Sequence, residues 1–312
     1  MSKPATATKR VESNSLSDKR QGEIKAVLDK LYERYNHRRL IKPDPLQFMY
    51  RYSRPVDMEI AAFLASSLAY GRVQQIEKSL GLLFEFMGKS PFEFVQDFDR
   101  HKRAQLKDFK HRFTAGDDIS DLLELFRTVL DQFGSLENFF ARGYSTDDKN
   151  IIPALSQFCD SLCAMHAQGH KGRLSNGLGY LLVSPARGSA CKRLNLFLRW
   201  VVRDDDVDAG LWKAVEKSKL VVPVDVHMGR LCKILGLYSR KTVSLSTAVE
   251  ITEGFASIEP ADPVKYDFAL SRIGIVENCD GRSRPACAAC ELLEFCRRRE
   301  YYQAGSGIIV ES

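Results

Sequence analysis

The sequence predicts an all-α protein. Apolar residues recur along most of the chain at intervals of three and four, the spacing that places them on one face of a helix. Alternating apolar and polar segments bounded by tight turns are scarce, and few β-branched residues flank the main hairpin candidate, Asn176-Gly177. A chain of 312 residues, 44 % of them hydrophobic, can bury a real core in one large domain or two ordinary ones.

The expected helices follow one another from about residue 21. The first carries a single apolar stripe that includes Ile24, Leu28 and Leu31. Two buried helices come next and meet near Tyr70-Gly71-Arg72. The last expected helix is opened by Asp262-Pro263, a capping residue followed by proline at the first helical position. The helices after the first are expected over 60–68, 76–86, 122–130, 151–165, 194–202 and 264–273.

Positive charge is concentrated near the N-terminus. Residues 1–55 hold 13 Lys and Arg against 6 Asp and Glu, whereas the rest of the chain is nearly neutral. Such an arm suits a polyanion such as nucleic acid, although a solvated tail can have the same composition. Long apolar runs and a signal-peptide pattern are both missing, which predicts a cytoplasmic protein without a membrane span and with reduced thiols unless they bind metal.

Four of the eight cysteines form a compact C-terminal pattern. Cys279, Cys287, Cys290 and Cys296 are separated by seven, two and five residues. The other four lie on apolar helical faces, where buried small hydrophobic side chains are expected. Structural zinc usually uses two short Cys-x-x-Cys pairs, and this segment has one. Four spread thiolates fit a [4Fe–4S] cluster better, with zinc as the alternative.

A second motif lies upstream, where the sequence reads Val-Pro-Val-Asp-Val-His from Val222 to His227. Together with the cysteine pattern 54 residues beyond Asp225, it resembles the helix-hairpin-helix DNA glycosylases that include endonuclease III, in a branch of unknown function. The specific resemblance covers residues 184–299. It implies two helical lobes, a helix-hairpin-helix-like element and a C-terminal iron–sulfur loop. One departure is the first cysteine gap, which has seven residues where the family has six.

The hairpin departs further from the family, which typically has Leu-Pro-Gly-x-Gly and a catalytic lysine about 18 residues before the aspartate. Here that position is Val207, within an acidic run that cannot bind phosphate. The better candidate is the segment 184–189, followed by a helix that begins near Lys192. Because Lys192 lies 33 residues before Asp225, residues 202–220 would be an insertion. An archaeal 8-oxoguanine branch of the superfamily has a similarly enlarged gap.

The predicted organisation has four parts. A disordered basic tail covers 1–20, and an N-terminal helical segment over 21–55 packs on the C-terminal lobe. A helical-bundle lobe covers 56–204, with its hairpin near 184–200. The C-terminal lobe covers 205–312 and holds the Asp225 motif and the iron–sulfur loop over 279–296.

The resemblance gives Asp225 and Lys192 catalytic roles. A carboxylate near the sugar carbon stabilises the positive charge that develops when the base leaves, and a helix N-terminus keeps such a carboxylate ionised. A lysine amine can attack the same carbon and form a Schiff base. The alternatives are that Asp225 only caps the following helix and that Lys192 is a surface residue or contacts phosphate.

Further residues are expected to contact DNA. Gly188 and Ser189 would offer backbone N–H groups to a phosphate at a helix N-terminus. Tyr70 or Gln74 would fill the gap left by an extruded base. The remaining expected contacts are Arg72, Arg193, His227 and Arg230, with Arg297, Arg298 and Arg299 beside the cysteine loop.

The function predicted from these features is that of a DNA glycosylase, which removes a damaged or mispaired base in base excision repair. If Lys192 forms the Schiff base, AP lyase activity is expected as well. The enzyme would act as a monomer on double-stranded DNA carrying a lesion, in association with the nucleoid. One alternative is a non-catalytic iron–sulfur protein that binds nucleic acid on the same fold. Another is a zinc-stabilised regulatory protein. No short motif in the sequence identifies the base.

Overall fold

The computed structural model describes residues 18–169, 172, 174–276, 279 and 285–296. It is predominantly helical, which confirms the predicted all-α class. Within these residues the one sheet is a short antiparallel pair, β1 (Lys110–His111) and β2 (Thr114–Ala115). Most of the predicted basic tail over 1–20 lies outside the described residues.

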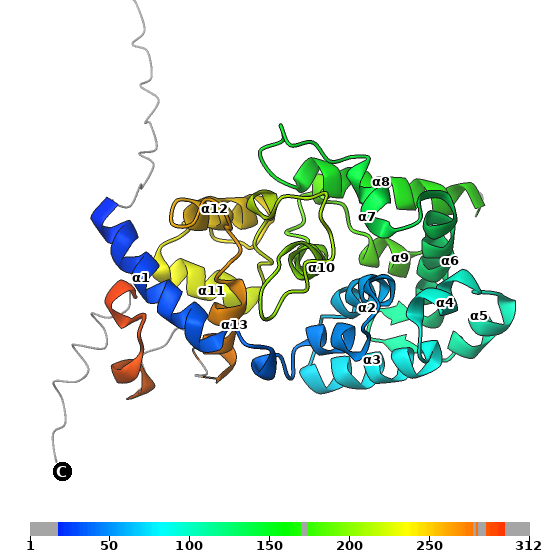
Figure 1. The fold of residues 1–312 in the computed structure, drawn as a ribbon, viewed down its shortest axis with the longest axis horizontal. Coiled ribbons are helices and arrows are strands. Elements are labelled where there is room, and N and C mark those ends of the chain that lie inside the picture. Colours follow the sequence, from blue (N-terminus) through cyan, green and yellow to red (C-terminus); the bar gives the residue numbers. More distant parts are fainter. Residues whose placement is uncertain (1–17, 170–171, 173, 277–278, 280–284, 297–312) are drawn as a thin grey trace, which may run out of the picture.

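Figure 1 shows an elongated molecule with two groups of helices and α10 between them. The first group contains α2 (Pro55–Ser67), α3 (Val73–Met87), α4 (Pro91–Gln96), α5 (Arg100–Leu106), α6 (Gly116–Phe133), α7 (Leu136–Ala141), α8 (Ile152–Gly169) and α9 (Asn176–Leu181). The second contains α1 (Asp18–Tyr35), α11 (Val226–Leu235), α12 (Leu245–Ala256) and α13 (Asp267–Val276), with α10 (Lys192–Val202) in the centre. Short 3₁₀ helices cover Arg38–Leu40, Pro45–Arg51, Pro185–Arg187, Lys217–Lys219, Pro285–Ala289 and Leu293–Phe295.

Helices α2 and α10 pack against each other and form the centre of the core. Helix α2 is apolar on nearly every side, and a helix of that composition is stable only when it is buried. Its Phe63 ring lies 4.8 Å from Phe126 and 4.9 Å from Phe197, in edge-to-face arrangements. Trp212, from the segment after α10, packs 5.2 Å from Phe197. This aromatic cluster fixes α10 against the first group of helices.

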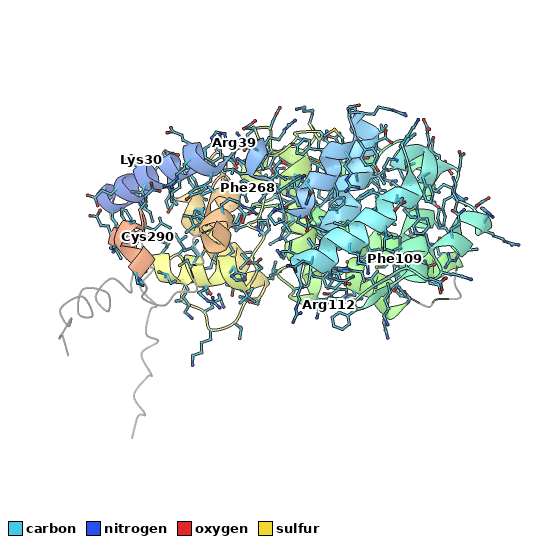
Figure 2. The ribbon with its side chains drawn as sticks, turned by 90° about the horizontal axis from the view of Figure 1, so that it is seen from below. Lys30, Arg39, Phe109, Arg112, Phe268 and Cys290 are labelled. Atoms are coloured by element: carbon cyan, nitrogen blue, oxygen red, sulfur yellow. The ribbon has the colours of Figure 1, made fainter. Side chains whose placement is uncertain are left out.

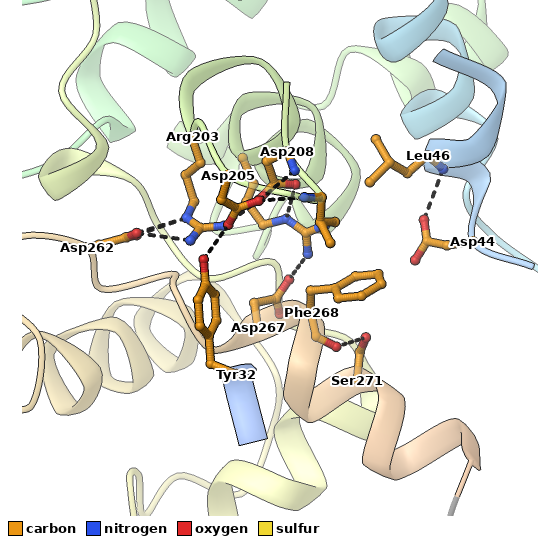
Figure 3. Close-up of polar contacts among 12 residues, drawn as sticks. Tyr32, Asp44, Leu46, Arg203, Asp205, Asp208, Asp262, Asp267, Phe268 and Ser271 are labelled. Carbon is orange, nitrogen blue, oxygen red and sulfur yellow. Dashed lines mark hydrogen bonds and ion pairs between the residues drawn. The ribbon is translucent and has the colours of Figure 1, made fainter. Parts of the chain in front are cut away.

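The opposite face of α10 carries buried charge (Figure 3). Arg199 pairs with Asp208 at 3.2 Å and also contacts Asp267 at the start of α13. Arg203 pairs with Asp262 at 3.0 Å and contacts Asp208 as well. Because each of these side chains is less than a tenth exposed, the ions stabilise the fold only as a complete set. Asp208, the last residue of the acidic run 204–208, is therefore part of the protein interior, while Asp204 and Asp206 of the same run remain exposed.

Helix α1 packs along α13 although the two are far apart in sequence. Asp29 accepts hydrogen bonds from Lys265 (2.7 Å) and from the Tyr266 hydroxyl (2.8 Å). Near the cysteines, Arg34 pairs with Glu291 at 3.2 Å. Helix α1 thus packs on the C-terminal lobe, whereas the 3₁₀ helix Pro45–Arg51, which the sequence analysis placed in the same segment, packs on α2 and α3. No helix among the described residues is long and apolar enough to cross a bilayer.

The buried ion network gives a stability prediction. Asp208→Asn should lower the free energy of unfolding by about 3–5 kcal/mol, because it leaves two buried guanidinium groups short of an anion. The matched control is Asp204→Asn in the same acidic run, since Asp204 is 73 % exposed and pairs with exposed Lys213 at 3.5 Å. The control should change stability by no more than about 0.5 kcal/mol. Urea and thermal unfolding measure both, and equal effects would contradict the importance of the network.

Candidate active site

Asp225 is the N-cap residue of α11. Its Oδ1 atom accepts hydrogen bonds from the backbone N–H groups of His227 and Met228, both at 2.9 Å. Pro223 restricts the residue before it to extended backbone, which brings the chain to the start of the helix. The expected capping contact is therefore present, and it uses one carboxylate oxygen.

The second oxygen of Asp225 contacts Lys192. Lys192 is the first residue of α10, and its Nζ atom lies 3.1 Å from Asp225 Oδ2. The preceding residue, Cys191, has φ +46°, a left-handed conformation that costs a non-glycine residue roughly 1–2 kcal/mol. Its thiol donates a hydrogen bond to the Val183 carbonyl oxygen at 3.3 Å, which holds this turn in place. The two predicted catalytic residues thus meet as an ion pair between two helix N-termini.

The ion pair lies on the wall of a cavity of about 550 Å³ between the two groups of helices. The Lys192 and Asp225 side chains are 32 % and 35 % exposed, so both are within reach of a ligand. The volume is within the usual range of small-molecule sites. Other lining residues include Pro43, Asp44, Tyr70, Leu196, Arg199, His227, Asp267 and Arg272.

The charges around the pair keep Asp225 ionised. Burial by itself would raise the pKa of the Asp225 carboxyl, but the Lys192 ammonium and the Met228 amide outweigh burial, and the pKa lies below its usual value. Asp267, which also lines the cavity, has the opposite balance: burial raises its pKa even though Arg199 contacts it. The pKa values of two carboxyl groups on one cavity are therefore shifted in opposite directions.

Three of the predicted DNA contacts lie at the connection between α2 and α3. Tyr70 lines the cavity, and its hydroxyl donates to the His111 carbonyl oxygen at 2.8 Å. Arg72 is the exposed N-cap residue of α3, and Gln74 is exposed in the first turn of that helix. Tyr70 is thus fixed to the β1–β2 hairpin, while Arg72 and Gln74 face solvent.

The predicted hairpin region, residues 184–189, forms a turn that is closed by backbone hydrogen bonds between its own residues. Gly188 is left-handed (φ +82°), and its N–H donates to the Pro185 carbonyl oxygen at 2.8 Å. The Ser189 hydroxyl accepts a hydrogen bond from the Cys191 N–H at 3.2 Å. Because its N–H is used inside the turn, Gly188 does not offer it to a phosphate as the sequence led us to expect.

Arg193 is also engaged within the protein. Its guanidinium donates to the Ser67 carbonyl oxygen at 2.9 Å and to that of Tyr180, and it lies 4.1 Å from the centre of the Tyr180 ring. These contacts hold the guanidinium beside the Tyr180 ring, and the contact of Arg193 with DNA stays a prediction. His227 lines the cavity and is exposed, and Arg230 follows one turn later on α11 with a half-buried side chain.

Sequence reasoning missed the arginines and acids that line the cavity. One signal for Arg199 was present, because Lys192, Leu196 and Arg199 are spaced by four and three residues and so share one face of a helix. Asp267 and Arg272 carry no such signal, since nothing local places α13 opposite α10. Asp44 reaches the site through its 3.2 Å pair with Arg272.

A second cavity of about 310 Å³ adjoins the first. The two share Ala69, Tyr70 and Lys192, and the second is also lined by Tyr180 and Ser189. Lys192 therefore lies where a groove could continue from the ion pair toward the turn at 184–189.

The four C-terminal cysteines are gathered near one another. Burial raises the pKa of Cys290, and the negative charges of Cys279, Cys287 and Cys296 raise it further. Leu292 and Phe295 are buried and hold this segment against the core. The other three thiols thus lie close enough to Cys290 to affect its titration, and no group of three or more His, Cys, Asp or Glu among the described residues is arranged to hold a metal ion. Arg297, Arg298 and Arg299 lie outside the described residues.

The fold and site define an all-α protein with a carboxylate–amine pair in an interlobe cavity. The chain belongs to the DUF2400 family, described as a protein of unknown function, whose model matches residues 44–276. This region contains Lys192 and Asp225 and ends before Cys279. Neither a curated protein nor a solved structure matches the chain significantly.

The ion pair predicts how Asp225 titrates. In Lys192→Ala the pKa of Asp225 should rise, because burial is then opposed mainly by the helix amides, whereas Lys192→Arg should keep it low. Carbon-13 NMR of the carboxyl groups measures this directly.

The lowered pKa of Asp225 also determines whether the stability of the fold rises or falls with pH. A lowered carboxyl pKa stabilises the fold above about pH 4, and this contribution is lost as the pH falls through the folded-state pKa. The wild type should therefore lose more stability on acidification than Lys192→Ala. An unchanged Asp225 pKa in Lys192→Ala would contradict the pairing.

Proposed function

We propose that this protein is a DNA glycosylase with AP lyase activity, which removes a damaged or mispaired base in base excision repair. The observation that carries the proposal is the 3.1 Å contact between Lys192 Nζ and Asp225 Oδ2 on an open cavity. Sequence resemblance to the helix-hairpin-helix glycosylases gives these same two residues the catalytic roles. We propose a monomer acting on double-stranded DNA that carries a lesion.

Base release requires a nucleotide to leave the helical stack and enter a pocket. As the bond between the base and C1′ breaks, the base keeps the electron pair and positive charge develops on the sugar. The Asp225 carboxylate, ionised because its pKa is lowered, would stabilise that charge. Since the helix amides already hold its other oxygen, Asp225 would need little reorganisation during the reaction.

Lys192 would act as the nucleophile. Its ammonium must first lose a proton, which the Asp225 carboxylate can accept within hydrogen-bonding distance and pass on to the departing base, so that the carboxylate is ionised again as charge develops on the sugar. The neutral amine then forms a bond to C1′ as the glycosidic bond breaks, the sugar ring opens, and a Schiff base results. Elimination of the 3′ phosphate from this intermediate cuts the strand, and hydrolysis returns the free lysine.

We also propose that Cys279, Cys287, Cys290 and Cys296 hold a [4Fe–4S] cluster, which their donor chemistry supports. When bound, the cluster would supply four iron–thiolate bonds that fix the C-terminal segment, and base release needs no electron transfer. The segment it would fix packs on α1 through the Arg34–Glu291 pair. Zinc remains the alternative metal.

One observation favours a second function, non-catalytic binding of nucleic acid. The Gly188 N–H is used inside its own turn, so the backbone phosphate site expected at the hairpin is reduced. A protein of this kind would bind damaged DNA through the same cavity without releasing a base.

Substitutions at the ion pair separate the two functions. Asp225→Asn should slow base release from a lesion duplex by at least about 100-fold, because the charge that stabilises the sugar cation is lost, while duplex binding changes little. Lys192→Ala should abolish the covalent adduct that borohydride traps between protein and DNA. Incubation with duplexes that each carry one lesion measures both effects.

Lys233→Ala is the matched control, because this lysine lies near the C-terminal end of α11, where it donates to the Arg240 carbonyl oxygen at 2.9 Å. It should release base and form adduct as the wild type does. Base release by Asp225→Asn at the wild-type rate would exclude the proposed mechanism. Tight binding of lesion duplexes by a wild type that releases no base would favour the non-catalytic function.

The metal proposal predicts a coloured protein. The wild type should carry four iron atoms and four sulfides per chain and absorb broadly in the visible range. Cys290→Ser should lose iron and colour, whereas Cys163→Ser, on α8 outside the cluster segment, should keep both. A colourless preparation with one zinc per chain would establish the zinc alternative, and a folded protein without metal would refute both.

A further inference from the structure

A phenylalanine stands exposed at the tip of the β1–β2 hairpin. The Phe113 side chain is 66 % exposed, and it follows Arg112, which has the left-handed φ of +52°. The Arg112 side chain packs across Gly71, where an added Cβ would come within 2.7 Å of its Cδ atom. Figure 2 shows Arg112 at the edge of the molecule, in line with an outward-facing tip. A single exposed apolar side chain is common on protein surfaces, so its neighbours decide whether Phe113 belongs to a site.

Phe113 belongs to a cluster of three aromatic rings from three separate segments. Its ring is nearly parallel to that of Tyr70, with 6.4 Å between centres and 2° between planes. Tyr180 contacts both rings edge-on, at 6.0 Å from Phe113 and 5.2 Å from Tyr70. We call Tyr70, Phe113 and Tyr180 the aromatic platform.

The Tyr70 ring, against which Phe113 stacks, is held by hydrogen bonds. The Tyr70 hydroxyl donates to the His111 carbonyl oxygen and lies 2.8 Å from Thr114 Oγ1, so it is tied to both strands of the hairpin. The buried His111 ring is 3.0 Å from Ser79 Oγ on α3 and 3.0 Å from the Tyr70 carbonyl oxygen. A ring fixed in this way loses little conformational entropy when it stacks on a ligand.

Positive charge surrounds the rings. The Arg193 guanidinium lies 5.1 Å from the Tyr70 ring centre and 4.1 Å from that of Tyr180, and Arg112 lies 5.3 Å from Phe113. Arg72 and Lys110 are exposed on the adjoining segments. Planar rings among cations match a nucleic acid, in which flat bases alternate with phosphates.

The platform is also next to the reacting pair. Tyr70 lines both cavities, Tyr180 lines the second, and Lys192 is shared by the two. When a nucleotide leaves the stack, the base opposite it loses its partner and exposes a planar face. We propose that the aromatic platform binds this unpaired base, with Phe113 stacking on it. The inference rests on the proposed DNA substrate, and it does not require base release.

This role differs from the one expected of Tyr70 and Gln74. Tyr70 is fixed by its hydrogen bonds and supports Phe113, and Gln74 lies on α3 outside the aromatic cluster. Of the three rings Phe113 is the most exposed, at 66 % against 38 % for Tyr180, and it belongs to none of the motifs that the sequence presented.

The test uses the full-length protein and a duplex with a stable abasic analogue opposite 2-aminopurine, a fluorescent base that is quenched by stacking. The wild type should bind and quench the fluorescence. Phe113→Ala should bind about 5- to 100-fold more weakly and lose the quenching, and Phe113→Trp should restore both. Phe86→Ala is the matched control, because Phe86 is also exposed (43 %) but lies at the far end of α3.

The abasic duplex has no base to release at the lesion, so this result is independent of glycosylase activity. If quenching depends on Phe113 but the protein releases no base, the proposed role of the aromatic platform stands and the glycosylase proposal is wrong. If the wild type releases base, and Phe113→Ala binds and quenches as the wild type does, the glycosylase proposal stands and the proposed role of the aromatic platform is wrong. Equal losses in Phe113→Ala and Phe86→Ala would overturn it as well.

Discussion

The structure depends on two arginines buried on one face of α10. A guanidinium cannot be deprotonated to escape burial, so each needs carboxylates within the interior. Arg199 finds them in Asp208 and Asp267, and Arg203 in Asp208 and Asp262. These acids come from the turn after α10, from the loop before α13 and from α13 itself. The charge requirement therefore fixes α10 relative to the C-terminal lobe, while aromatic packing fixes it to the other lobe.

The position of the candidate active site follows from that constraint. Lys192 precedes Arg199 by seven residues, about two helical turns, so both side chains project from the same face of α10. Once Arg199 is bound to α13, Lys192 must face the N-terminus of α11, where Asp225 lies. Arg199 also balances the charge of Asp267 inside the cavity. Lys192 is thereby left to pair with Asp225, which explains the lowered pKa of that carboxyl.

A structural feature could be predicted from the sequence where the interactions that determine it join residues close together in the chain. The all-α class follows from apolar spacing, and the Asp225 cap follows from residues next to it. The sequence interpretation also paired Lys192 with Asp225, and the structure places them in contact. The acidic run 204–208 was interpreted only as unable to bind phosphate. The pairs that Asp208 makes with Arg203 and Arg199, five and nine residues before it, depend on the turn after α10, which apolar spacing does not predict. The internal hydrogen bonds of Arg193 and Gly188 were not predicted either, because their acceptors, the carbonyl oxygens of Ser67, Tyr180 and Pro185, have no signature in the sequence.

Helix α13 connects the candidate site to the cysteines. Its first residue, Asp267, binds Arg199, and its C-terminal end lies three residues before Cys279, which itself lines the cavity. Helix α1 packs along the same helix and reaches the cysteine segment through Arg34 and Glu291. The family match contains the ion pair and α13 but stops before Cys279, the first of the four C-terminal cysteines. A metal centre on the cysteines would therefore act on the chemistry by holding one end of α13, while the buried arginines hold the other.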